Sequence, residues 1–180
     1  MIDPHDPARP PRRLILAGGG HAHLAVLAAW ITDPPPDLET WLITPTPDTI
    51  YSGMVPGWIE GLYDRTDLLI DLQPLAQKAG VHLIIGRVAA LDADQKIITL
   101  DSGAAMPFDV LSLGVGGSID PEPLSTLGSR VLTVRPIEGL IARWPSVVSA
   151  ARHKQNFALA VVGGGAAGVE LSLAAHQAIP

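Results

Sequence analysis

Close to its N-terminus the chain reads Leu14-Ile15-Leu16-Ala17-Gly18-Gly19-Gly20-His21-Ala22-His23. Four apolar or small residues lead into three glycines, and an apolar run follows, which predicts a strand, a tight turn and the start of a helix. Such a junction suits a pyrophosphate. The first glycine makes the turn, the second lets the backbone approach the phosphate, and the helix amides and dipole receive the negative charge.

A second junction of the same kind occurs near the other end of the chain. It reads Ala160-Val161-Val162-Gly163-Gly164-Gly165-Ala166-Ala167-Gly168-Val169-Glu170. One glycine-rich loop is weak evidence for nucleotide binding, but two, each after an apolar strand and before an apolar helix, are much stronger.

The composition narrows the class of protein. The 180 residues are 47% hydrophobic and 17% charged, which is typical of a globular chain. A net charge of -6 without a basic stripe argues against a nucleic-acid partner. The sequence contains no cysteine, which excludes disulfides, thiolate metal sites and redox chemistry through a cysteine pair. No apolar run reaches about 18 residues, so a cytoplasmic location is expected, with peripheral membrane contact as an alternative.

The N-terminal half predicts an α/β fold. A strand at 14–17, a helix at 24–31 that is apolar all round and so buried on several sides, and a strand at 40–44 form a Rossmann-like βαβ unit. Residues 45–66 read as a long loop that is functional or carries short helices. Asp71 is a good N-cap for a helix over 71–79, and Gly80 suits its C-terminal end.

The remaining chain predicts further strands and a second domain. Strands at 81–88, 96–100 and 110–113 form a β-meander, a Pro-rich linker covers 119–129, and a short strand at 131–134 precedes a helix around 137–150. A parallel-type strand at 157–162 leads to the second loop. The predicted division is a tail at 1–12, a first nucleotide-binding domain at 13–118, a connecting segment at 119–155, and the start of a second domain at 156–180.

Only one helix follows the second glycine-rich loop before Pro180. A Rossmann half needs further strands to cover its helix, so the helix over 166–179 is expected to be uncovered, with coverage by another segment of the chain as the alternative. The sequence is therefore interpreted as a fragment of a longer protein or a truncated form.

The order of these elements resembles the pyridine nucleotide-disulfide oxidoreductase superfamily, over about residues 13–180. The run Phe108-Asp109-Val110-Leu111-Ser112-Leu113-Gly114-Val115-Gly116 has the form of the family's closing strand, with Gly-Val where Ala-Thr is usual. The resemblance implies that the first loop binds FAD and that the second binds NAD(P)H. Its flavin would do the chemistry, so no catalytic side chain is predicted.

Within the superfamily, three stretches look most like the type II NADH dehydrogenase-like flavoproteins, including the module sometimes fused to selenide, water dikinase. These stretches are the Gly18–His23 loop, Tyr51–Gly57 and Ile70–Leu75. Disulfide reductases and sulfide:quinone reductases need cysteines. The absence of cysteine from this sequence counts against both classes.

The resemblance also implies a set of cofactor-binding residues. A surface loop at 52–54, a plain strand end at 87–88 and a favoured acid near a helix start at Glu170 would explain those candidates equally well, whereas pyrophosphate binding is favoured over a plain tight turn at Gly18 and Gly20. The candidates are Gly18, Gly19, Gly20, His21, Ala22, Thr44, Pro45, Ser52, Gly53, Met54, Arg87, Val88, Gly114, Gly116, Gly163, Gly165, Gly168 and Glu170.

The first loop departs from the family pattern at two positions. His23 replaces the third glycine, so the helix is expected to stand off slightly and His23 to pack at its start. Thr44 stands where an acid usually binds the ribose, and its hydroxyl is a weaker substitute. His21 and His23 are two residues apart, a spacing that does not converge on one ion, so no metal site is predicted.

The leading hypothesis is an FAD-dependent NAD(P)H oxidoreductase that passes hydride to flavin and electrons to a quinone or another small acceptor. The alternatives are a non-catalytic nucleotide-binding or regulatory module and an inactive N-terminal fragment of such a flavoprotein. Further partners compatible with the resemblance are a fused or associated selenophosphate-synthesising domain and a second copy of the chain.

Overall fold

The computed structural model describes residues 10–179 and divides the chain into two compact units. The predicted tail at 1–12 therefore lies almost wholly outside the described residues, and the first strand begins at Arg12. One unit contains the residues up to Thr49 together with Asp71–Gly116, and the other contains Ile50–Ile70 together with residues 117–180. Residues 50–70 thus pack with the C-terminal segment, whereas the sequence-based division placed them in the first domain at 13–118.

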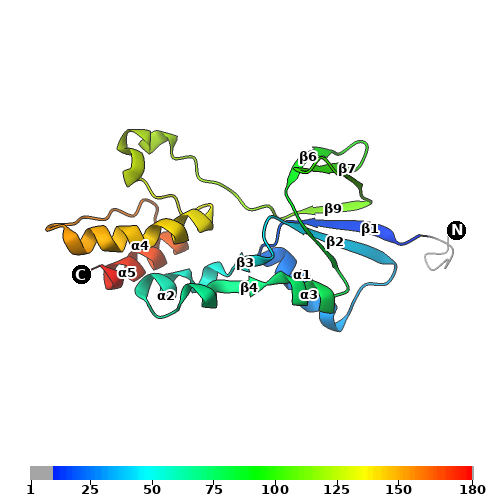
Figure 1. Cartoon of the computed structure of the whole chain (residues 1–180), viewed down its shortest axis with the longest axis horizontal. Coiled ribbons are helices and arrows are strands. Elements are labelled where there is room, and N and C mark those ends of the chain that lie inside the picture. The colour runs from blue at the N-terminus through cyan, green and yellow to red at the C-terminus, as the bar shows by residue number, and fades with distance from the viewer. Residues whose placement is uncertain (1–9, 180) are drawn as a thin grey trace. The chain divides into compact units, whose positions relative to one another are not determined.

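The first unit is built on a four-stranded parallel sheet (Figure 1), in the order β5-β2-β1-β9. Its α/β character agrees with the fold class expected from the sequence. Two strands, β2 and β9, flank β1, and Ala17 at its end is in register with Ile43 on one side and Leu113 on the other. The strands are β1 (Arg12–Ala17), β2 (Leu38–Thr44), β5 (His82–Ile85) and β9 (Val110–Leu113).

Alternate residues of the central strands face different layers, as the two-residue period of a strand requires. Leu16 and Leu42 are buried with residues of helices α1 (His21–Thr32) and α3 (Leu72–Lys78), including Leu27 and Leu72. On the other face, Ile15 and Ile43 pack against Ile98 and Leu100 of a second, antiparallel sheet. That sheet contains β6 (Val88–Asp92), β7 (Ile97–Leu100) and β8 (Ala105–Pro107).

The strands predicted at 96–100 and 110–113 are present, as β7 and β9, and an antiparallel three-stranded sheet exists, but the prediction assigned the wrong strands to it. The apolar run at 81–88 is divided between two sheets, β5 in the parallel one and β6 in the antiparallel one, because the chain turns at Gly86 and Arg87. The final predicted strand, β9, pairs with β1 in the parallel sheet, whereas β8 was not predicted at all. A local pattern indicates a strand but not the sheet to which the strand belongs.

Two helix predictions have different outcomes. Asp71 caps α3 as expected, because its Oδ1 accepts a hydrogen bond of 3.0 Å from the Gln73 N–H, and Gly80 follows with a φ of +68°. Helix α1 was expected to be buried on several sides. Only His23 and Leu27 are buried, since one face lies on the sheet and the rest, including Ile31, is exposed or half-buried.

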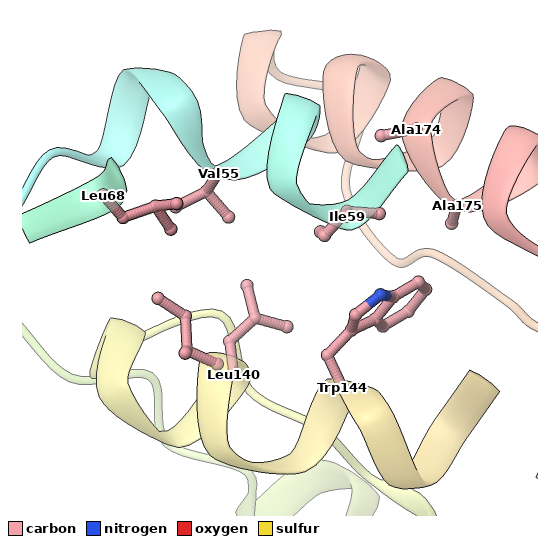
Figure 2. Packing of buried hydrophobic residues seen from close by; sticks show 8 residues of the cluster. Val55, Ile59, Leu68, Leu140, Trp144, Ala174 and Ala175 are labelled. Carbon is pink, nitrogen blue, oxygen red and sulfur yellow. The ribbon is translucent and has the colours of Figure 1, made fainter. Parts of the chain in front are cut away.

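The second unit is a small helical cluster (Figure 2). Val55 and Ile59 of α2 face Leu140 and Trp144 of α4 across a shared apolar core, to which α5 contributes Ala174 and Ala175. The long loop expected at 45–66 contains short helices. Its elements are η1 (Ser52–Met54), α2 (Val55–Glu60) and η2 (Arg65–Leu68), and the later helices are η3 (Glu122–Arg130), α4 (Ile137–His153) and α5 (Ala166–Ala178).

Four expectations for the C-terminal half require correction. The linker at 119–129 carries helical turns of η3, and residues 131–134 and 157–162 are not strands. Within residues 10–179 no strand lies beside 157–162, so its backbone has nothing to pair with and Val162 stays 82% exposed. Helix α5 is not uncovered, because Ala174 and Ala175 are buried, although Leu173 on another face remains exposed.

Two short strands, β3 (Asp48–Ile50) and β4 (Leu69–Asp71), form a separate two-stranded sheet.

In the part of the chain that the structure describes, no helix has the length and apolar character needed to cross a membrane.

Candidate dinucleotide-binding loops

The first candidate site lies at the carboxyl edge of the parallel sheet. Backbone hydrogen bonds tie the strand ends together at this edge: Gly18 N–H donates to the Ile43 carbonyl at 2.7 Å, and Gly114 N–H donates to the Ala17 carbonyl at 2.8 Å. In open parallel sheets, ligands bind outside the carboxyl ends of the strands. The glycine-rich loop thus begins at the edge where a ligand is expected.

The first two glycines of the first loop leave little room for a side chain. Gly18 has a φ of +102°, and a Cβ atom on it would collide with the carbonyl oxygen of Gly114. A Cβ on Gly19 would come within 2.7 Å of Cδ1 of Leu72 and 3.1 Å of Oγ1 of Thr44. These contacts require glycine at both positions, as the sequence predicts for a loop whose backbone turns sharply and stays open to a ligand.

The loop leads directly into the N-terminus of α1, and this helix start suits an anion. Gly20 is the N-cap of α1, with φ -75° and ψ 178°, and no side chain caps the helix there. The first turn of α1 contains no acidic residue. The positive end of the helix dipole therefore meets no carboxylate of that turn, which is the arrangement that a phosphate prefers.

His23 occupies the position of the missing third glycine. Its side chain is 2% exposed, and its Nδ1 lies 2.5 Å from the Gly18 carbonyl oxygen while its Nε2 lies 2.9 Å from Oγ of Ser112. The ring also fills the space beside Gly114, where a Cβ would come within 2.8 Å of its Cε1. His23 packs at the helix start as expected, and its ring links the loop to β9.

The second loop repeats the backbone conformation of the first at its first glycine and at its N-cap. Gly163 has a φ of +118°, and Gly165 is the N-cap of α5 with φ -74° and ψ 173°. No side chain caps α5, and its first turn holds no acid. A Cβ on Gly168 would collide with the Gly163 carbonyl oxygen, so the third glycine permits close packing of the helix on its own loop.

The sequence and the structure of the chain were compared with those of known proteins. No family model and no curated protein sequence matches the chain. Solved structures do match. NDH2 from Plasmodium falciparum in complex with NADH aligns with a TM-score of 0.70 and 16% identity, over 92% of this chain and 37% of that one. A ferredoxin reductase from Rhodopseudomonas palustris aligns with a TM-score of 0.70 and 20% identity, over 93% and 41%.

The sulfide:quinone oxidoreductase of Aquifex aeolicus also aligns, with a TM-score of 0.54 and 25% identity, over 60% of this chain and 25% of that one. This chain has the fold of the pyridine nucleotide-disulfide oxidoreductases. It spans only about a quarter to two-fifths of the length of these three structures.

Within this oxidoreductase fold, Thr44 does not present its side chain to solvent. It is 2% exposed and lies under Gly19, while Pro45 after it is exposed. A ribose-binding group has to be accessible to the ligand. The burial of Thr44 therefore does not support the expectation that its hydroxyl substitutes for a ribose-binding acid. The Thr44 Oγ1 atom lies 3.1 Å from the point that a Cβ atom on Gly19 would occupy.

The other candidate cofactor-binding residues of the first unit do not all lie at the glycine-rich loop. His21 and Ala22 form the exposed first turn of α1. Arg87 has its N–H bonded to Oδ1 of Asp101 at 3.2 Å, and Val88 pairs with Leu100 in the antiparallel sheet, so both positions serve the β6–β7 connection. Gly116 has a φ of +77° with open space around it.

The remaining candidates belong to the second unit. Ser52, Gly53 and Met54 form η1, and Met54 packs against the cluster of Figure 2. Glu170 is exposed on α5 but lies beyond the first turn, which corrects the expectation of a first-turn acid.

Sequence reasoning missed two residues that shape the first loop. Leu72 and Ser112 are distant in sequence from Gly19 and His23, which they contact. Ser112 is 89 residues from His23. The only available signal was a polar residue inside the otherwise apolar strand β9, Val-Leu-Ser-Leu.

Proposed function

We propose that this chain provides the dinucleotide-binding parts of an FAD-dependent NAD(P)H oxidoreductase. The observation that carries the proposal is the repetition of one loop conformation at two helix starts. Gly18 and Gly163 have φ values of +102° and +118°, and Gly20 and Gly165 are uncapped N-caps with nearly identical dihedrals. Two diphosphate loops in one chain suit an enzyme that uses two dinucleotides.

The residues of the first loop fit the diphosphate of FAD. Side chains at Gly18 and Gly19 are sterically excluded, and the first turn of α1 is free of acids. We assign Gly163, Gly165 and Gly168 to the diphosphate of NAD(P)H by the same reasoning. Bound flavin would supply the redox chemistry, by accepting hydride from the nicotinamide and passing electrons to a quinone or another small acceptor.

The chain's own contribution is binding and orientation. Loop amides at the start of α1 would hold the diphosphate, and the adjacent strand ends of β1, β2 and β9 fix the position of the loop. The NADH named for the Plasmodium falciparum structure, which has the same fold, supports a nicotinamide substrate.

A spectroscopic experiment tests this function. The purified chain is reconstituted with FAD, freed of excess flavin, and its visible absorbance is recorded anaerobically before and after NADH or NADPH is added. Retained flavin absorbance that bleaches with either nucleotide is the expected result. A Gly18→Val variant is the matched control, because its side chain would meet the Gly114 carbonyl and block the loop. Absence of retained flavin in the unmodified chain would refute the proposal.

The burial of Thr44 favours a second candidate, a nucleotide-binding module without redox activity. Thr44 offers no exposed group to a ribose at the end of β2. Calorimetric titration with ADP and FAD separates the two functions: binding of both without bleaching by NAD(P)H would support the module.

A further inference from the structure

The first loop contains a histidine where the second loop contains a glycine. His23 and Gly168 each lie five residues after the first glycine of their loop, Gly18 and Gly163. In the second loop the helix backbone approaches the Gly163 carbonyl so closely that a Cβ on Gly168 could not fit. In the first loop the carbonyl of Gly18 instead meets the imidazole of His23, 2.5 Å from Nδ1.

The hydrogen-bond partners of His23 define the position of its proton. A carbonyl oxygen only accepts, so Nδ1 must carry the hydrogen that it shares with Gly18. In the neutral ring, Nε2 is then an acceptor, and the hydroxyl of Ser112 donates to it at 2.9 Å. His23 is 2% exposed, so the imidazole is buried at its end of both bonds.

The two bonds of the imidazole link the glycine-rich loop to the neighbouring strand at this edge of the sheet. Gly18 begins the loop after β1, and Ser112 lies in the neighbouring strand β9. Gly114, which directly follows β9, leaves room for the ring because a Cβ there would come within 2.8 Å of it. The Gly18 peptide is therefore held from two sides, by the Gly114 backbone and by the imidazole.

We propose that His23 is a positioning residue for diphosphate binding, which replaces the third glycine by holding the Gly18 carbonyl with Nδ1–H and anchoring the ring to Ser112. This inference rests on the proposed function, because it assigns the loop to a dinucleotide diphosphate. By fixing the Gly18 peptide, His23 fixes the direction of the loop amides that follow it, which would otherwise reorganise on binding.

The test measures the preference of the chain for ADP over adenosine, by calorimetry with both probes. Positioning of the loop affects only the ligand with a diphosphate, whereas general destabilisation would weaken both. His23→Leu keeps an apolar side chain of moderate size but removes both hydrogen bonds. His23→Asn retains an amide N–H near the position of Nδ1, and Ser112→Ala removes the anchor alone. His176→Asn and Ser146→Ala, at exposed positions, are the matched controls.

We expect His23→Leu to lower the preference for ADP about tenfold and Ser112→Ala to lower it about threefold, the range for one or two hydrogen bonds. His23→Asn should restore most of the loss, and the controls should match the unmodified chain. An unchanged preference in folded His23→Leu, or in Ser112→Ala if His23→Leu does not fold, overturns the inference. Failure of the unmodified chain to bind ADP and FAD overturns the proposed function itself, and the inference with it.

Discussion

The hydroxyl oxygen of Thr44 lies 3.1 Å from the position that a Cβ atom of Gly19 would occupy, and Cδ1 of Leu72 lies 2.7 Å from the same point. Both side chains are buried, at the end of β2 and at the start of α3. The second glycine of the loop therefore rests on packed side chains.

Gly19→Ala should destabilise the chain, because the new methyl group has to displace Leu72 or Thr44 in a filled space. We expect the free energy of unfolding to fall by about 1–3 kcal/mol in urea titrations. Gly164→Ala is the matched control at the equivalent position of the second loop, where nothing lies within 4 Å, and it should change the value by less than about 0.5 kcal/mol. Equal effects at both positions would contradict this packing.

Gly168→Ala should loosen the start of α5, since the added carbon would meet the Gly163 carbonyl oxygen. Hydrogen exchange of the α5 amides should show a loss of about 1–3 kcal/mol in the free energy of local opening. Gly139→Ala, in α4 with no atom within 4 Å of the new carbon, is the control and should leave α5 protection unaltered. Unchanged α5 protection in Gly168→Ala would show that the helix can move away without cost.

Ile59→Ala should weaken the helical cluster of the second unit. Ile59 is buried on α2 among Leu140, Trp144 and Ala174 (Figure 2), so its truncation leaves a cavity. We expect a loss of about 2–5 kcal/mol in unfolding free energy for this unit, followed by the fluorescence of its tryptophans. Leu62→Ala, at a side chain that is 70% exposed, is the control and should lose less than about 0.5 kcal/mol.

Asp71→Ala should destabilise α3, because it removes the acceptor of the Gln73 N–H at the N-terminus of the helix. The expected cost is about 0.5–2 kcal/mol in thermal or urea unfolding, and Asp71→Ser should recover most of it because serine is also a good N-cap. Asp94→Ala, in an exposed turn, controls for the loss of one negative charge. A cost in Asp94→Ala as large as that in Asp71→Ala would assign the effect to charge instead of capping.

Elements with strong local signals were predictable from the sequence. The first glycine-rich loop, the helix after it and the N-cap at Asp71 follow from turn chemistry, apolar patterning and capping, which act within a few residues. The division of 81–88 between two sheets was not predictable, because strand pairing depends on residues elsewhere in the chain.

In the candidate site, too, features set by neighbouring residues were predictable, whereas contacts with residues distant in sequence were not. Glycine at 18 and 19 could be predicted from the turn, but the reason for each lies in Gly114, Leu72 and Thr44, which are far away in sequence. The partner of His23 at Ser112 could not be identified from spacing for the same reason. The strand predicted at 157–162 failed because an apolar run becomes a strand only beside another strand.

The two loops have nearly the same dihedral angles but differ at the third glycine position. A search by residue letters for Gly-x-Gly-x-x-Gly would find the loop at Gly163 and overlook the one at Gly18. A search by backbone angles, with a positive φ at the first glycine and an extended N-cap two residues later, would retrieve both. Chains whose third glycine has been exchanged for a hydrogen-bonding side chain should therefore be sought by conformation.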